Sequence, residues 1–309
     1  MTVIDLHTLQ AIESNCDSVL CLGNFDGIHI GHQALINETL RIRSELSLSR
    51  PGIKSGVWFF KKSPFEIISK KHLPHIIDFD SKLRTFAELG LDLAYIYEYE
   101  EIGNFSPEQF VENVLKKECG CVFAVCGYNF KFGKNASGDA NTLSTLMGGN
   151  TSVVIRVTLD GKPVSSSEIR RLISEGDVET ASFLLGRKYS ITGKVLHGKQ
   201  LGRKLGIPTI NQIFSPNIAI PKKGIYISRT LINGNWIPSV SNIGFRPSVE
   251  NSETMNCETY IIDFDGDLYG QEIEVEFFKR LRDEKKFDNI DALRWQIQQD
   301  IEKAKEYFK

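Results

Sequence analysis

The spacing of apolar residues changes near Gly186, and the change divides the 309-residue chain into two regions of different fold class. In the first region short apolar runs alternate with amphipathic segments of helical period. The runs cover residues 19–22, 56–60, 93–97, 122–126 and 152–157. This alternation predicts an α/β domain, a Rossmann-like parallel sheet covered by helices on both faces.

The most clearly marked helix of the first region begins after Ser106. Ser106 can cap it, Pro107 takes the first helical position, and Gln109 completes a capping box. Apolar residues at 110, 111, 114 and 115 form its buried stripe, and Gly120 ends it. We therefore expect an α-helix there, and further helices at 81–89, 167–174 and 177–185.

After Gly186 the signals are those of strands and turns. The predicted strands are 189–197, 224–232, 236–241, 257–264 and 272–278, and Asn233-Gly234 is a hairpin turn. This even run predicts a small antiparallel β-barrel. Residues 288–308 follow as a C-terminal helix whose stripe of Ile290, Leu293, Ile297 and Ile301 needs a surface to pack on. The predicted domains are residues 1–186 and 187–309.

Composition excludes several classes of partner. The formal net charge of −2 gives no electrostatic reason to expect nucleic acid or an anionic membrane. No apolar run approaches the roughly 20 residues that span a bilayer, and no secretory signal begins the chain. The six cysteines form no paired CxxC array, so buried thiols are favoured over disulfides or a metal set. We expect a cytoplasmic protein with small-molecule substrates, a monomer or a weak homo-oligomer.

The first candidate site is the stretch GNFDGIHIGH at residues 23–32, between an apolar strand and a helical pattern. A strand-to-helix turn directs backbone N–H groups and the helix dipole at an anion, and its glycines let the backbone approach a phosphate. His29 and His32, three residues apart, can both face one phosphoryl group, and with Mg²⁺ they can stabilise its charge. The stretch therefore predicts an ATP site for nucleotidyl transfer, with ATP-binding residues Gly23, Asn24, Phe25, Asp26, Gly27 and Gly31. The alternatives are two structural histidines, or a zinc site, which lacks a third ligand pattern.

The second candidate site is the glycine-rich basic stretch at residues 193–211. Its glycines and cations suggest a phosphate cradle, although the stretch does not match a P-loop. Thr209 and Asn211 follow, two residues apart on one face of an extended segment, where neutral oxygens can hold Mg²⁺ between ATP phosphates. The predicted ATP-binding residues are Gly198, Lys199, Gly202, Arg203, Gly206, Pro208, Thr209 and Asn211, the last two also as metal ligands.

These stretches resemble a known family. Residues 23–32, 126–139 and 164–171 resemble the adenylyltransferase half of bacterial bifunctional riboflavin kinase/FAD synthetases, and residues 193–211, 241–248 and 258–287 resemble the riboflavin kinase half. The likeness runs from about residue 19 to about residue 303. It implies a nucleotidyltransferase domain followed by a riboflavin kinase-like barrel. It also implies phosphorylation of riboflavin by ATP to FMN, then adenylylation of FMN to FAD with release of pyrophosphate, with Mg²⁺ at both sites.

The resemblance assigns further residues. In the first half Asn129 and Phe130 would bind flavin, and Ser166, Ser167 and Arg170 would lie near the triphosphate, where a helix start followed by an arginine also makes a phosphate clamp. Ser63 stands where the family has a histidine in a Phe-x-Pro-His-Pro pattern. In the second half Glu258 would be the base that activates the ribityl hydroxyl, with Arg282 and Phe287 binding the flavin. Tyr260 replaces a family histidine.

Two alternatives to the two-step enzyme stay open. The Ser63 departure allows a riboflavin kinase whose adenylyltransferase domain is weakened or inactive. The second alternative is a regulator that senses a flavin or a nucleotide without turnover. The presence of the candidate catalytic and metal-binding residues argues against it: His29, His32, Thr209, Asn211 and Glu258.

Overall fold

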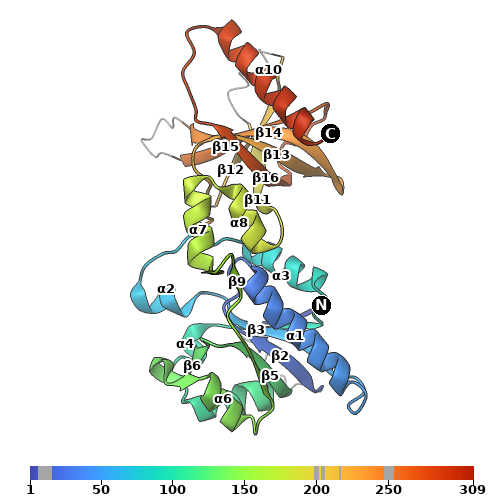
Figure 1. Ribbon diagram of the computed structural model, residues 1–309, viewed down its shortest axis with the longest axis vertical. Helices are drawn as coiled ribbons and strands as arrows, with labels where there is room; N and C mark the ends of the chain where they lie inside the picture. The colour runs from blue at the N-terminus through green and yellow to red at the C-terminus, as the bar shows by residue number, and fades with distance from the viewer. Residues whose placement is uncertain (6–15, 198–201, 203–205, 216, 247–253) are drawn as a thin grey trace. The chain divides into compact units, whose positions relative to one another are not determined.

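The computed structural model describes residues 1–5, 16–197, 202, 206–215, 217–246 and 254–309 (Figure 1). These residues form two compact units. The first consists of Met1–Leu73 and Asp78–Ser165, and the second of Pro74–Ile77 and Ser166–Lys309.

The first unit is built on a six-stranded, entirely parallel sheet in the order β1-β4-β3-β2-β5-β8. Its strands are β1 (Thr2–Asp5), β2 (Ser18–Leu22), β3 (Lys54–Phe60), β4 (Leu93–Tyr97), β5 (Cys121–Gly127) and β8 (Thr151–Val154). The prediction of a parallel α/β sheet is therefore confirmed. The edge strand β1 was not predicted from the sequence, because four residues carry too little periodic signal.

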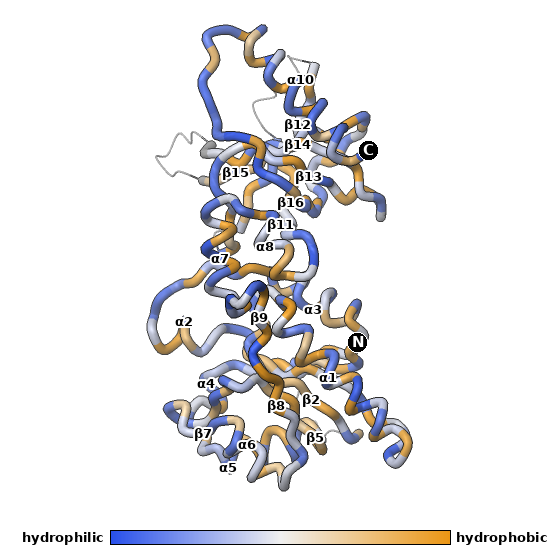
Figure 2. Tube along the Cα trace, viewed as in Figure 1, coloured by the Kyte–Doolittle hydropathy of each residue, from blue (hydrophilic) through white to orange (hydrophobic). Residues whose placement is uncertain are grey.

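Helices cover both faces of this sheet. Helix α1 packs on one face, where Cys21 of β2 is buried, and α3 places Phe86 against Phe59 of β3 on the same face. The other face buries Leu20 and Leu22 against the helices that follow β4 and β7. In Figure 2 hydrophobic colours follow β2, β5 and β8, whereas the helices change colour from turn to turn, as one-sided burial requires. The helices are α1 (Ile30–Leu46), α2 (Pro64–Ser69), α3 (Phe79–Glu88), α4 (Tyr99–Ile102), α5 (Pro107–Gln109), η1 (Phe110–Glu118), η2 (Lys134–Ala136) and α6 (Ala140–Leu146). The short strands are β6 (Lys131–Phe132), β7 (Gly138–Asp139), β9 (Thr158–Leu159) and β10 (Lys162–Pro163).

The helix after Ser106 differs from the prediction in its type. Its capping box is as expected, since the Gln109 amide donates to Ser106 Oγ at 3.2 Å and the Ser106 amide donates to Gln109 Oε1 at 2.9 Å. Only α5 is an α-helix, however, and residues 110–118 form the π-helix η1, in which the Cys119 amide donates to the Val114 carbonyl oxygen. The predicted α-helix is wrong there because apolar pairs four residues apart are buried by either helix type.

The second unit contains a closed antiparallel barrel in the order β11-β12-β15-β14-β13-β16, which confirms the predicted barrel. The strands are β11 (Tyr189–Leu196), β12 (Thr209–Ile213), β13 (Gly224–Ile232), β14 (Asn235–Arg246), β15 (Thr254–Ile261) and β16 (Glu272–Arg282). Asn233 and Gly234 both have positive φ and join β13 to β14, as the hairpin prediction required. The barrel interior holds a row of buried hydroxyls, in which Ser241 Oγ lies 2.8 Å from both Ser228 Oγ and Thr259 Oγ1.

The described part of the second unit also contains the helices α7 (Ser166–Glu175), α8 (Val178–Leu185) and α10 (Ile290–Tyr307). Helix α10 packs Ile301 and Ala304 against the outer face of the barrel. Ile290 was predicted to belong to this stripe. It is 64% exposed, however, because it is the first residue of the helix. Pro74–Ile77 also belongs to this unit, where the Ala219 amide donates to the His75 carbonyl oxygen at 2.8 Å.

None of the six cysteines, all within the described residues, forms a disulfide. Among the described residues no helix has the length and apolar character needed to cross a membrane.

Candidate active sites

The first site lies where the strand order of the parallel sheet reverses. After β2 the chain adds β3 and β4 on one side, and β5 and β8 on the other. Open parallel sheets bind ligands at the carboxyl ends of the strands beside such a switch point. Residues 23–29 form the turn that leaves the carboxyl end of β2 at this position and leads into α1.

The backbone of this turn is strained. Phe25 and Ile28 have φ values of 52° and 43°, and Gly27 lies between them at 82°. Left-handed backbone is unfavourable for a bulky or β-branched residue and persists only when the surroundings enforce it. Both side chains are completely buried, so packing holds the turn in this form.

His29 at the end of the turn and His32 in the first turn of α1 lie together. His29 is the N-cap of α1, and its Nδ1 accepts a hydrogen bond from the His32 amide at 3.2 Å. The rings stack with centroids 3.7 Å apart and planes 13° from parallel. Neutral His29 therefore carries its proton on Nε2. A Cβ on Gly31 would lie 3.1 Å from the His29 ring, so glycine leaves room for this arrangement.

Three other predicted residues lie at the same edge of the sheet because its strands are parallel. Leu22 at the end of β2 pairs with Cys126 of β5, so Asn129 and Phe130 follow at the carboxyl end of β5. It also pairs with Trp58 of β3, and Ser63 follows that strand. Ser63 is the N-cap of α2, but its side chain makes no capping hydrogen bond.

Ser166, Ser167 and Arg170 belong to the second unit and not to the unit that carries the turn. They lie at the start of α7, and Arg170 Nε donates to the Pro74 carbonyl oxygen at 2.8 Å.

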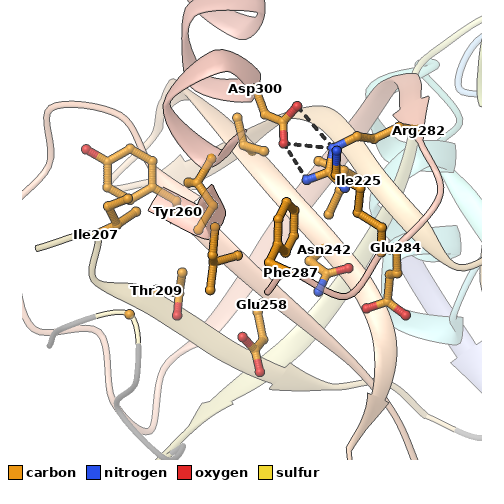
Figure 3. Close-up of a pocket in the computed structure, with 15 residues that line it drawn as sticks. Ile207, Thr209, Ile225, Asn242, Glu258, Tyr260, Arg282, Glu284, Phe287 and Asp300 are labelled. Atoms are coloured by element: carbon orange, nitrogen blue, oxygen red, sulfur yellow. Dashed lines mark hydrogen bonds and ion pairs between the residues drawn. The ribbon is translucent and has the colours of Figure 1, made fainter. Parts of the chain in front are cut away.

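The second site is a pocket of about 320 Å³ between the outer face of the barrel and α10 (Figure 3). Five of the predicted residues line it: Gly202, Thr209, Glu258, Arg282 and Phe287. Gly198, Lys199 and Arg203 lie outside the described residues. Gly206 and Pro208 are described but are not part of the pocket wall.

Strand register brings the polar groups of this pocket together. Glu258 of β15 pairs with Asn211 of β12 on one side and with Asn242 of β14 on the other. In the next row on the same face Thr209 pairs with Tyr260. A carboxylate thus lies beside an amide and near a hydroxyl, although these residues are far apart in the chain.

Gly202 is required where β12 begins. A Cβ there would lie only 2.4 Å from the Ile207 carbonyl oxygen and 3.3 Å from Thr209 Oγ1. The Ile207 amide donates to the Gly202 carbonyl oxygen at 2.9 Å. Glycine therefore lets the backbone at residue 202 lie close to Thr209.

Arg282 is held by a carboxylate rather than directed freely into the pocket. Its Nη2 lies 2.7 Å and its Nε 3.0 Å from Asp300 Oδ2, and the Asp300 side chain is only 1% exposed. Gln296 Nε2 donates to the other Asp300 oxygen at 3.2 Å. The pair links β16 to α10 and forms one wall of the pocket.

Asn242 is a pocket residue that sequence reasoning missed. It lines the cavity beside Glu258, and its Oδ1 is buried without a hydrogen-bond partner among the described residues. A buried oxygen without a donor is unfavourable, and such a cost is often retained where a ligand supplies the donor. Only the strand register, which the sequence does not display, could have identified it.

The oxygen donors of this pocket fit Mg²⁺. Magnesium takes few protein oxygens and completes its shell with water and substrate phosphate. Thr209 supplies a hydroxyl at the cavity wall, and Asn211 lies two residues further on the same face. No group of three or more His, Cys, Asp or Glu ligands occurs in the part of the chain that the structure describes.

Two family models match the chain. One, described as FAD synthetase, covers residues 11–168, and one described as riboflavin kinase covers residues 185–308. A protein named bifunctional riboflavin kinase/FMN adenylyltransferase from Bacillus subtilis is 33% identical over 303 residues, which cover 96% of this chain and 94% of that protein. Its namesake from Escherichia coli is 31% identical over 314 residues, covering 98% and 96%. A solved structure titled as a macrolide-efflux protein from Streptococcus pneumoniae matches with a TM-score of 0.89 at 27% identity and covers 99% of each chain.

Proposed function

The chain belongs to the bifunctional riboflavin kinase/FMN adenylyltransferase family, and from this membership we propose which of its residues carry out each step. It phosphorylates riboflavin with ATP to FMN and transfers AMP from a second ATP to FMN, which yields FAD and pyrophosphate. The functional domains are residues 1–186 for adenylyl transfer and 187–309 for the kinase.

In the adenylyltransferase, His29 and His32 stabilise the charge that develops on the α-phosphoryl group of ATP. Their stacked rings at a helix start support this role, because both imidazoles reach one anion together with backbone N–H groups. The terminal phosphate of FMN is already anionic at neutral pH, so this step requires no protein base. ATP is bound by residues 23–27 and Gly31. The flavin is bound by Ser63, Asn129 and Phe130. The triphosphate is bound by Ser166, Ser167 and Arg170.

In the kinase, Glu258 accepts the proton of the terminal ribityl hydroxyl as that oxygen attacks the γ-phosphoryl group of ATP. Thr209 and Asn211 would hold Mg²⁺, which would supply positive charge to the ATP phosphates. ATP is bound by Gly198, Lys199, Gly202, Arg203, Gly206 and Pro208. Phe287 and Arg282, which both line the pocket, bind the flavin, and the ion pair with Asp300 orients the Arg282 guanidinium.

One observation carries the kinase assignment. Register across β12, β15 and β14 places the Glu258 carboxylate between Asn211 and Asn242 at a cavity with apolar residues on its opposite wall. Such a cavity suits a substrate with an aromatic ring system and a polyol chain.

The experiment is incubation with riboflavin, ATP and Mg²⁺, followed by chromatographic separation of FMN and FAD. Sequential appearance of FMN and then FAD is expected. Accumulation of FMN without FAD would support the second candidate, a riboflavin kinase with an inactive adenylyltransferase. The replacement of the family histidine by Ser63, whose side chain makes no capping hydrogen bond, favours that candidate.

Cellular context completes the proposal. Because both reactions consume ATP and small flavins, we place the enzyme in the cytoplasm, with small molecules rather than nucleic acid or membranes as partners. We propose a monomer or weak homo-oligomer, which sedimentation at several protein concentrations would test.

A further inference from the structure

A buried lysine that the adenylyl-transfer chemistry does not use contacts the turn at residues 23–29. Lys82 lies on α3 and is only 7% exposed. Its Nζ donates to the carbonyl oxygen of Asn24 at 3.3 Å and lies 5.2 Å from the centroid of the Phe59 ring. The lysine therefore connects α3 directly to the backbone of the turn.

Such a lysine is costly for the fold. Removing an ammonium group from water is unfavourable unless opposite charge and hydrogen bonds replace the lost hydration. Burial holds the pKa of Lys82 below its ordinary value, and attraction from Asp26 opposes that shift. Asp26 is itself buried in the turn. An apolar side chain at position 82 would avoid this cost, so stability alone does not explain a lysine there.

The same helix also holds the next residue of the turn. Phe86, one helical turn after Lys82, packs edge-on against the ring of Phe25 with centroids 5.5 Å apart. Helix α3 thus contacts Asn24 through Lys82 and Phe25 through Phe86. These contacts hold the turn at the point where its backbone enters the left-handed region.

The charge of Asp26 makes the lysine important for ATP in particular. Asp26 lies in a turn whose backbone and helix N-terminus suit an anion, and an uncompensated carboxylate there would repel a triphosphate. We propose that Lys82 is a positioning residue for adenylyl transfer, which binds the Asn24 carbonyl oxygen and compensates the charge of Asp26 so that the turn accepts the ATP phosphates. This inference rests on the proposed role of residues 23–32 as the ATP-phosphate site.

The test is a charge-removal series in the full-length enzyme. Lys82→Met keeps the length of the side chain and removes its charge. Conversion of FMN to FAD should fall on the order of 10- to 100-fold, mainly through a higher KM for Mg–ATP. Riboflavin phosphorylation by the same polypeptide should stay within about twofold of the unmodified enzyme, because the barrel has its own core. Lys62→Met, the same change at an exposed lysine of the same unit, is the matched control and should leave both activities unchanged.

A second substitution separates compensation of charge from simple packing. If Lys82 compensates Asp26, Asp26→Asn should improve the KM for Mg–ATP in the Lys82→Met background, yet not in the unmodified enzyme. If the lysine is purely structural, the loss of activity caused by Lys82→Met and the loss caused by Asp26→Asn should add in the double variant. Should Lys82→Met lower the unfolding midpoint of the first unit, Lys82→Arg decides the question, since it keeps the charge. Retained FAD formation then supports the proposal, and its loss overturns it.

The failure of this inference is distinguishable from failure of the proposed function. If the unmodified enzyme makes FAD and Lys82→Met makes it equally well, Lys82 has no positioning role and the turn keeps its assignment. If His32→Ala also leaves FAD formation unchanged, the turn is not the adenylyl-transfer site and the inference falls with it.

Discussion

The two candidate active sites of this enzyme are assembled in opposite ways. In the parallel-sheet unit the two histidines and the strained turn come from one stretch, residues 23–32. In the barrel the pocket draws on residues from Gly202 to Asp300, brought together by β12, β14, β15, β16 and α10. Parallel strands end at one edge, so a single loop there can form a site, whereas a barrel wall presents one residue per strand in each row.

The interiors of the two units also differ in the polarity of their buried side chains. The parallel sheet buries apolar side chains on both faces. The barrel encloses Ser228, Ser241 and Thr259, whose hydroxyls satisfy one another across strands. Polar groups in the barrel thus depend on exact register, while the first unit depends on the conformation of a local turn. The following predictions test this contrast.

Glu258→Gln should have the largest effect. The amide cannot accept the ribityl proton, so FMN formation should fall by roughly 10²- to 10⁴-fold, the usual contribution of a general base. Conversion of supplied FMN to FAD should be unchanged, because none of the residues proposed for that step belongs to the barrel. Chromatography of both products measures this. Glu284→Gln, a change of another carboxylate in the same pocket, is the control, and equal losses in the two variants would contradict a specific role for Glu258.

His32→Ala should have the opposite selectivity, with loss of FAD formation and no loss of FMN formation. Loss of one charge-stabilising imidazole should reduce FAD formation by about 10²- to 10³-fold and leave riboflavin phosphorylation intact. His72→Ala is the matched control, since that exposed histidine pairs with Glu66 at 3.1 Å. A parallel decline of both activities in His32→Ala would mean that the two sites are not separate.

Asp300→Ala should destabilise the barrel by about 3 kcal/mol, because it leaves the Arg282 guanidinium without its partner in a largely buried position. Hydrogen exchange resolved by peptide should show faster opening of β16 and α10, while β2 and β5 are unaffected. Asp283→Ala, which removes the exposed partner of Arg280, should have little effect. Equal acceleration in both units would show that they do not open independently.

Asn242→Leu should separate activity from stability. Replacing a buried oxygen that lacks a donor by a side chain of similar size should change the free energy of unfolding by less than about 1 kcal/mol. Riboflavin kinase activity should nevertheless fall about tenfold, as expected when one ligand hydrogen bond is lost. Denaturant titration and initial rates measure the two quantities. A stability loss that accounts for the lost activity would argue for a structural role.

The smallest effect concerns the buried thiols. Burial raises the pKa of Cys21 and Cys121 to about 12, and of Cys126 and Cys257 to about 11. Thiolates form only above the pKa, so at pH 8 these residues should resist iodoacetamide in the folded enzyme. As the denaturant concentration rises, labelling of Cys21, Cys121 and Cys126 reports opening of the first unit, and labelling of Cys257 reports opening of the barrel. Rapid labelling of Cys257 without denaturant would contradict its burial.

Structural features that depend on contiguous residues could be predicted from the sequence. The strand-to-helix turn after β2, the capping box of Ser106 and Gln109, and the hairpin at Asn233-Gly234 each depend on neighbours in the chain. The order of strands and helices likewise follows from local periodicity, and it determined both fold classes. Where one local pattern serves two structures, as at residues 110–118, the prediction of an α-helix was wrong.

Only the tertiary structure decided the features that join distant segments. Arg282 pairs with Asp300 of α10, a partner that no local pattern of the sequence indicates. The place of Asn242 beside Glu258 follows from β14–β15 register, and the contact of Lys82 with Asn24 follows from the packing of α3 against the turn. The sequence by itself determined the elements and their local chemistry. The partners of each buried polar group were decided by tertiary packing, because their free energy depends on which segments meet after the chain has folded.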